Sequence, residues 1–192
     1  MFRDLSNEHT RRVSAFADRI KSSTSVKFNL AWTYGDYLAD VPARLGTNEA
    51  LDRAADAVLV AFGRFSTTYV DVTPVLLEKY TLALTALRTC LDDPVKAKAS
   101  ETLCAIMLLM ICQVRVFTPD LHSTLINEQT FLWTTTGPTI CHSEGAAQII
   151  RLRGRADNLG RFENNLLLAL RGVVASPLQT MLPSALIAGP AV

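Results

Sequence analysis

Residues 103–112 read LCAIMLLMIC, and this apolar run decides the fold. Its hydrophobic residues recur at the three- and four-residue spacing of a helix face: Leu103, Ile106, Met107, Met110 and Ile111. The residues between them are apolar as well, so the predicted helix is hydrophobic on every side, which is typical of a helix at the centre of a bundle or solenoid. A bilayer needs about 20 apolar residues in a row, so we expect a buried core helix here and no membrane span.

The segment before this run predicts a helix that folds back against it. Thr73-Pro74 and Asp93-Pro94 each place a capping side chain before a proline, which suits the first turn because its missing N–H has no helical partner there. We therefore expect a helix to begin at each pair. Only Asp92 and Asp93 separate the two patterns, which favours an antiparallel helical hairpin. The core face of the earlier helix is predicted to comprise Leu76, Tyr80, Ala83, Leu84, Leu87 and Leu91.

Helical periodicity extends over most of the other residues. We predict helices over Ser6–Lys21, over Val26–Val41, from a cap at Thr47 or Asn48 to Phe65, over Ser143–Gly154 with Ser143 as cap and Gly154 as left-handed terminator, and over Leu159–Val173. The third of these carries one continuous stripe: Leu51, Ala54, Ala55, Val58, Leu59, Phe62 and Phe65. The second carries Phe28, Trp32, Tyr34 and Tyr37, which we interpret as a core face, with a ligand pocket as the alternative. The predicted fold class is all-α, with about seven helices in antiparallel hairpins packed as a bundle or short solenoid.

Two stretches break the helical pattern. Residues 118–141 hold turn signals such as Gly137-Pro138, and we predict an irregular insert there. Residues 175–192 carry no charge and contain Pro177, Pro183 and Pro190, which predicts a disordered tail without a regular helix. The expected organisation is a helical domain over residues 1–174 followed by this tail. We expect the domain to be a fragment of a larger protein, truncated or misassembled around residues 118–141.

The charge balance argues against two classes of partner. The 192 residues carry a net charge of +1, evenly distributed over both halves, so no bulk field attracts nucleic acid or an anionic membrane. We expect neither direct DNA contact nor membrane binding. The first twelve residues are polar and do not resemble a secretion signal. Cys90, Cys104, Cys112 and Cys141 are therefore expected to be reduced, buried thiols, and their spacing fits no zinc site.

The sequence offers little for catalysis. It contains no G-x-S-x-G elbow, no Walker loop, no G-x-G-x-x-G and no H-E-x-x-H. The histidines His9, His122 and His142 are scattered, although the last two could meet in space, and we interpret His142 as a structural histidine. Asp93 of the Asp92-Asp93 pair is explained as a helix cap. We assign no catalytic residue, no cofactor-binding residue and no metal ligand, and we predict that the protein is not an enzyme.

A basic cluster comprises Arg151, Arg153, Arg155 and Arg161, with Asp157 and Glu163 among them. A phosphate contact is one interpretation. We favour a solvated helix end with local ion pairs, in which the stem of Arg153 packs on the helix and its head reaches Glu163.

Residues 142–154 read HSEGAAQIIRLRG. This segment resembles one in the fungal-specific regulatory domain of binuclear zinc-cluster transcription factors, where a histidine is followed by a Gly-Ala pair, an apolar helix and Arg-Gly. Leu166–Val174 is similar to the helix that follows in that family, and Leu103–Gln113 to the one that precedes. The likeness covers roughly residues 50–174. The sequence departs from the family at two points. The family has a tryptophan about one helical turn before the histidine, whereas Trp133 lies nine positions before His142. The six-cysteine zinc cluster of the family is missing.

The resemblance implies the regulatory region of a nuclear transcription factor that controls RNA polymerase II transcription without its own DNA-binding module. It implies zinc only in a missing N-terminal domain and no cofactor in this chain. The implied partners are other domains of the full-length protein or the transcription machinery, with a homodimer as a further option. The alternative function is a generic helical-repeat scaffold for protein interaction, which sequence upstream of Met1 would distinguish.

Overall fold

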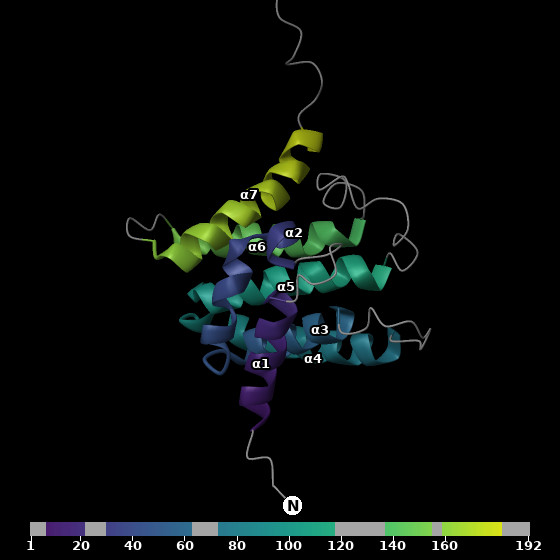
Figure 1. Cartoon of the computed structure of the whole chain (residues 1–192). Helices are drawn as coiled ribbons and strands as arrows, with labels where there is room; N and C mark the ends of the chain where they lie inside the picture. The colour runs from purple at the N-terminus through teal and green to yellow at the C-terminus, as the bar shows by residue number, and fades with distance from the viewer. Residues whose placement is uncertain (1–6, 22–29, 63–72, 118–136, 155–158, 182–192) are drawn as a thin grey trace, which may run out of the picture.

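The computed structural model describes residues 7–21, 30–62, 73–117, 137–154 and 159–181 (Figure 1). Over these ranges the chain is helical and has no strand, which confirms the predicted all-α class. The α-helices are α1 (Glu8–Lys21), α2 (Leu30–Tyr34), α3 (Glu49–Phe62), α4 (Thr73–Leu91), α5 (Ser100–Phe117), α6 (Gly137–Arg153) and α7 (Arg161–Met181). Short 3-10 turns are η1 (Asp36–Asp40), η2 (Pro42–Arg44) and η3 (Lys96–Lys98). Within the described ranges, no helix has the length and apolar character to cross a membrane.

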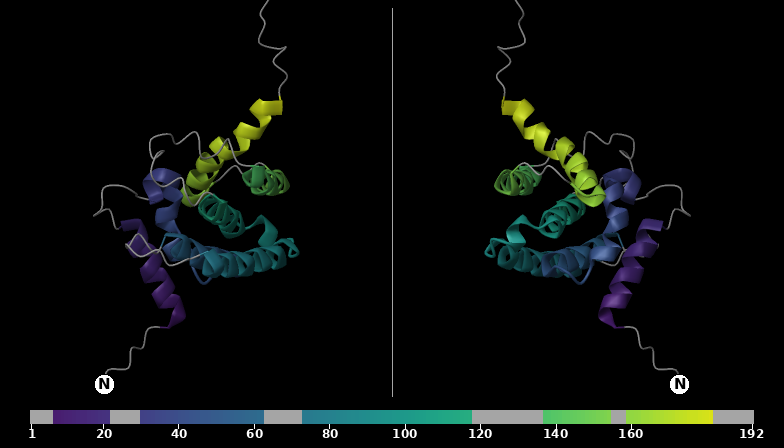
Figure 2. Two further views of the ribbon diagram at one scale, coloured as in Figure 1. Left: turned by 90° about the vertical axis from the view of Figure 1, so that its right-hand side faces the viewer. Right: turned by 90° about the vertical axis from the view of Figure 1, so that its left-hand side faces the viewer.

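Helix α5 is the centre of the molecule, as its sequence predicts. Every residue from Leu103 to Cys112 has an exposed fraction of 3% or less. Figures 1 and 2 show why: α3 and α4 form a layer on one side of α5, and α6 and α7 form a layer on the other. Helix α1 crosses the first of these layers and packs on α3. Apolar side chains on all faces of α5 are therefore removed from water, which is the main source of stability available to such a fold.

Polar contacts between helix ends fix the directions of the helices. The Cys90 thiol near the end of α4 donates to the side-chain oxygen of Asn48, just before α3, at 3.7 Å. The same Asn48 contacts Thr102 near the start of α5. Arg153, the last residue of α6, donates to Ser100 at the start of α5 at 3.1 Å. Helix α4 is therefore antiparallel to α3 and to α5, and α6 is antiparallel to α5, which confirms the predicted antiparallel packing.

The prediction of one continuous second helix over Val26–Val41 is wrong. Of its described residues, only Leu30–Tyr34 are α-helical, and the chain then passes through Gly35 with φ +120° into the 3-10 turn η1. That φ is not helical, and glycine adopts it more readily than other residues because glycine has no Cβ. A Cβ at Gly35 would also come within 3.1 Å of the Tyr37 ring and 3.3 Å of Ala169. The break turns Tyr37 into the core, where its side chain is fully buried, so for this ring the core interpretation is confirmed.

The predicted helix start at Asp93-Pro94 is also wrong. Asp93 does cap a turn, since its Oδ1 accepts the N–H groups of Val95 and Lys96 at 2.9 and 3.2 Å. These backbone hydrogen bonds lower the pKa of the Asp93 carboxyl. The turn ends after η3, however, because Ala99 is extended (φ −69°, ψ 144°), and α5 begins only at Ser100. The link of the α4–α5 hairpin is therefore longer than the two residues expected.

The helices near the C-terminus extend beyond their predicted bounds. Helix α6 begins at Gly137, so Gly137-Pro138 belongs to its first turn and Ser143 lies inside the helix, not at its cap. The predicted insert 118–141 thus overlaps a helix, and its residues 118–136 lie outside the described ranges. Gly154 has φ +70° and ends α6 as predicted. Helix α7 continues through Pro177 to Met181, which contradicts the expectation of no regular helix from residue 175.

The predicted core faces hold with one exception. In α3 the stripe residues Leu51, Ala54, Ala55, Val58 and Phe62 are buried, Leu59 is partly buried, and Phe65 lies outside the described ranges. In α4 the side chains of Leu76, Ala83 and Leu87 are buried and those of Tyr80 and Leu84 are partly buried. Leu91, which was expected in the core, is 40% exposed. It is the last residue of α4, next to buried Cys90, whose thiol contacts Asn48.

Candidate functional site

Five helix ends meet at one end of the molecule and bring polar side chains together. They are the starts of α3, α5 and α7 and the ends of α4 and α6. We call this group the helix-end cluster; it comprises Arg44, Asn48, Cys90, Ser100, Glu101, Thr102, Arg153 and Glu163. Hydrogen bonds within the cluster join residues up to 57 positions apart in the sequence. Because it joins charged, amide, hydroxyl and thiol side chains beside a pocket, it is the candidate site.

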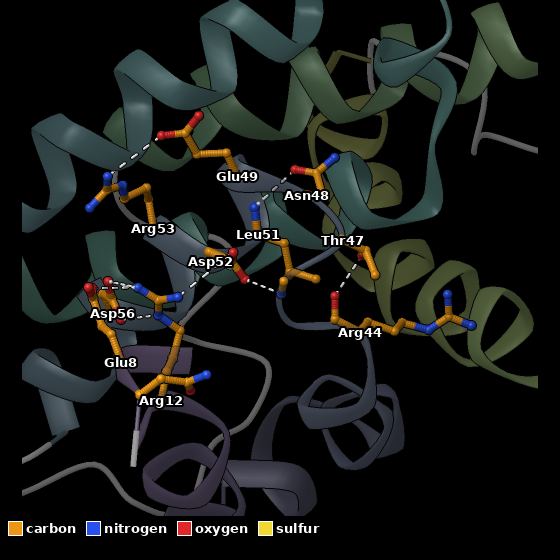
Figure 3. A network of polar contacts seen from close by, with 12 residues as sticks. Glu8, Arg12, Arg44, Thr47, Asn48, Glu49, Leu51, Asp52, Arg53 and Asp56 are labelled. Carbon is orange, nitrogen blue, oxygen red and sulfur yellow. Dashed lines mark hydrogen bonds and ion pairs between the residues drawn. The ribbon is translucent and has the colours of Figure 1, made fainter. Parts of the chain in front are cut away.

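Asn48 is the centre of the cluster. Its Oδ1 accepts the N–H of Leu51 at 3.2 Å and so caps α3, as the sequence predicts (Figure 3). Its Nδ2 donates to the hydroxyl of Thr102 at 3.0 Å, and that hydroxyl donates to the carbonyl of Lys96 at 2.7 Å. Thr102 is fully buried, so its hydroxyl needs these partners. One side chain thereby joins α3, α4, η3 and α5.

Arg44 links η2 to α5 and α7. Its Nη1 donates to Glu101 at 2.5 Å, and its guanidinium lies 3.9 Å from the centre of the Phe162 ring. A cation over an aromatic face at this distance is attracted by the ring quadrupole. Both charged side chains are only partly exposed, so the pair is less screened than a surface salt bridge.

Arg153 links the end of α6 to α5 and α7. It pairs with Glu163 in the first turn of α7, which confirms the ion pair predicted from the sequence, and it donates to the hydroxyl of Ser100 at 3.1 Å. Its Nη1 is buried and has no hydrogen-bond partner. Burial lowers the pKa of Arg153, because taking the cation out of water disfavours the charged form. The pair joins the end of α6 to the next helix in the chain.

A pocket of about 310 Å³ opens beside the cluster. Its lining includes Thr47, Glu49, Cys90, Lys96 and Glu101. The two carboxylates are engaged, since Glu101 pairs with Arg44 and Glu49 with Arg53 at 3.6 Å. The volume is at the lower end of what small-molecule sites occupy. The cluster thus holds helices together and borders a pocket, and both carboxylates that line this pocket are committed to ion pairs.

A second polar group ties α1 to α3 (Figure 3). Arg12 donates through Nε and Nη2 to the two oxygens of Asp56 at 2.6 and 3.0 Å, lies 3.8 Å from Asp52 and reaches Glu8 at 3.1 Å. The hydrogen bond to Asp56 raises the pKa of Arg12 against the opposing effect of burial. Two parallel bonds of this kind also fix orientation. Asp52 in turn accepts the N–H of Gly46 at 2.7 Å, which anchors the loop before α3.

His142 is the histidine that the structure places in a defined contact. Its Nε2 lies 2.6 Å from the hydroxyl of Tyr80, which joins α6 to α4. Burial lowers the pKa of His142, so the neutral ring is favoured. His122, the possible partner considered from the sequence, lies outside the described ranges. The ring of His9 lies against Gly46, in the loop before α3.

The remaining sequence candidates are dispersed. Arg151 is exposed, Arg161 pairs with Asp40 at 2.6 Å, and Arg155 lies outside the described ranges. Cys104 and Cys112 are buried free thiols whose pKa is raised by burial, as expected for core cysteines, and Cys90 is likewise free and buried. Cys141 and Trp133 cannot be placed, since nothing is described of their side chains. In the described part of the chain, no group of three or more His, Cys, Asp or Glu side chains is arranged to hold a metal.

Two features of the cluster were missed by sequence reasoning. Asn48 was identified as a cap, but its bond to Thr102 was not predicted, because that contact joins residues 54 positions apart. The pairing of Arg44 with Glu101 was missed for the same reason. Their signal in the sequence is weak, because polar residues near helix starts are already explained by capping.

Comparison with known proteins adds no relative. The chain matches no protein-family model, no curated protein and no solved structure.

Proposed function

We propose that this chain is the helical regulatory region of a fungal transcription factor of the binuclear zinc-cluster type. In this proposal it acts in the nucleus on RNA polymerase II transcription, through contacts with other domains of its full-length protein or with the transcription machinery. Zinc would be bound only by a separate zinc-cluster domain.

The observation that carries the proposal is the packing of the segment His142–Gly154. It forms most of α6, lies against the apolar helix α5, and is followed by α7, which holds the segment 166–174. These are the three helices on which the resemblance rests, in the same order. The residues that give the segment its pattern are used to seat it: His142 contacts Tyr80, Arg153 pairs with Glu163, and Gly154 ends the helix.

The exposed side of α6 then offers a surface for contacts. Glu144, Gln148, Arg151 and Leu152 are exposed, and Leu152 is 65% exposed. Because the polar groups of the helix-end cluster are engaged in holding helices together, contact with other proteins is favoured over chemistry as the mode of action.

A reporter assay tests regulation. The full chain is inserted between a heterologous DNA-binding domain and an activation domain, and transcription from a matching promoter is measured. We expect the folded chain to lower the output by about 5-fold or more, the effect of a coupling of about 1 kcal/mol. The matched control carries Leu108→Asp, which destroys the core at a fully buried position of α5. Equal output from the two fusion proteins, at equal protein levels, would sink the regulatory proposal.

A helical interaction scaffold is the second candidate function. The observation that favours it is a pair of exposed apolar side chains on one side of α4: Val75 and Leu82, seven residues apart, are 48% and 41% exposed. Single exposed apolar residues are common, but neighbours on the same side of a helix favour a contact surface. The mature transcript distinguishes the two functions: an upstream zinc-cluster coding region supports the regulator, and further helix pairs support the scaffold.

A further inference from the structure

Helix α1 carries a serine that is preceded by two arginines. Residues 11–14 read RRVS, and Ser14 is the only serine or threonine of the sequence with arginines at both the second and the third position before it. Protein kinases select their substrates in part by the charges around the acceptor, and carboxylates bind arginine in a fixed, bidentate geometry. The pattern therefore fits a kinase whose substrate groove is lined by carboxylates.

Ser14 lies on the solvent side of α1. It is two positions before Phe16, which is only 1% exposed, so at 3.6 residues per turn the two side chains project from opposite sides of the helix. Arg11, the first of the two arginines, is exposed like Ser14. The acceptor and one of its two recognition residues are therefore at the surface while α1 is packed.

The second arginine is held by α3. Arg12 donates to the two carboxylate oxygens of Asp56 at 2.6 and 3.0 Å, and its side chain is 11% exposed (Figure 3). Residues two positions apart in a helix do not face each other, so a groove that contacts Arg12 and Ser14 together requires this part of α1 to leave the helical conformation. A kinase and Asp56 therefore compete for Arg12.

The place of α1 in the fold allows it to open separately from the core. It lies on the outside of the layer formed by α3 and α4 (Figure 2), and among its described side chains Phe16 and Ile20 are the buried ones. Segments with few buried apolar contacts open at a lower free energy than the core helices do. Opening of α1 exposes the whole RRVS segment while α3, α4 and α5 stay packed.

We propose that Ser14 is a phosphorylation site for an arginine-directed serine/threonine kinase, and that the ion pair between Arg12 and Asp56 withholds the site while α1 is packed. In the reaction, the Oγ of Ser14 attacks the γ-phosphorus of ATP, the bond from that phosphorus to the bridging oxygen breaks, and ADP leaves. The hydroxyl proton passes to the catalytic aspartate of the kinase. This inference is independent of the proposed function.

Phosphorylation of the full chain tests the site. The chain is incubated with MgATP and the catalytic subunit of cyclic-AMP-dependent protein kinase, and the initial rate of phosphate incorporation at Ser14 is measured by peptide mass spectrometry. We expect wild type to be phosphorylated at Ser14 and Ser14→Ala to lose that phosphate. Arg11→Ala should lower the initial rate about 10-fold, because it removes a charged contact with the kinase.

Asp56→Asn tests the control by the ion pair. Asparagine keeps the shape of the side chain but loses the charge that binds Arg12, which shifts α1 towards the open form. When opening and closing are fast, the rate of modification follows the population of the open form. We therefore expect Asp56→Asn to be phosphorylated at Ser14 about 10-fold faster than wild type.

The matched control is Glu49→Gln, which removes a carboxylate of the same helix α3 that pairs with Arg53 and not with α1. It should leave the rate at Ser14 unchanged. Circular dichroism verifies that each variant is folded. Absence of phosphate at Ser14 in both wild type and Asp56→Asn overturns the proposed site. A rate that Asp56→Asn does not raise, or that Glu49→Gln raises equally, overturns the control by the ion pair.

Discussion

Replacing Asn48 by alanine should separate two contributions that the structure assigns to one side chain. The substitution removes the cap of α3, a hydrogen bond to the N–H of Leu51 that contributes about 1 kcal/mol in comparable helices. It also removes the 3.0 Å bond from Nδ2 to the buried hydroxyl of Thr102, which contributes about 1 kcal/mol net. We expect a loss of about 2 kcal/mol in the free energy of unfolding and a melting temperature lower by about 4–8 °C.

Asn48→Asp isolates the cap. An aspartate caps as well as asparagine, and its charge is favourable at the start of a helix. It cannot donate to Thr102, however, whose own hydrogen is given to the carbonyl of Lys96. We therefore expect Asn48→Asp to lose about 1 kcal/mol, roughly half the effect of the alanine variant.

Thr102→Val completes the cycle with a side chain of nearly the same shape. Urea titrations of the full chain at pH 7, followed by helical ellipticity, give the free energy of unfolding for wild type, the three single variants and the double variant Asn48→Ala with Thr102→Val. The two positions should be coupled by about 1 kcal/mol. Equal losses for Asn48→Ala and Asn48→Asp would refute the capping role, and additive losses for Asn48→Ala and Thr102→Val would refute the link between α3 and α5.

Three further predictions concern buried polar groups. The fully buried Tyr37 hydroxyl has no hydrogen-bond partner among the described residues, so Tyr37→Phe should leave stability to urea unchanged or raise it by about 1 kcal/mol; a loss would contradict this reasoning. Burial lowers the pKa of His142 below 6.5, so the unfolded state binds a proton first as pH falls. In urea titrations, the difference in free energy of unfolding between wild type and His142→Gln should therefore shrink between pH 7.5 and pH 5. A difference that does not depend on pH would contradict this reasoning. Glu163→Gln leaves the Arg153 cation, which is 15% exposed, without its carboxylate. In thermal or urea unfolding it should lower the free energy of unfolding by about 3 kcal/mol, more than Arg153→Met, which removes the charge altogether. The reverse order of the two losses would count against a desolvated ion pair.

The parts of the fold that could be predicted from sequence are those encoded by local pattern. The run 103–112 is apolar on every side, and the structure buries every face of it. Asn48 and Gly154 act within a few residues of their own position, as a cap and as a terminator, and both were identified. The Arg153–Glu163 pair was also predictable, because it spans a single link between two helices.

The errors arose where a non-local contact outweighs the pattern. The spacing of apolar residues in Val26–Val41 fits a helix, but Gly35 breaks it so that Tyr37 can enter the core. Asp93-Pro94 has the chemistry of a helix start, yet the chain extends at Ala99 and the hydroxyl of Thr102 then reaches the carbonyl of Lys96. Residues far apart in sequence, such as Arg44 and Glu101, leave no periodic signal before they meet.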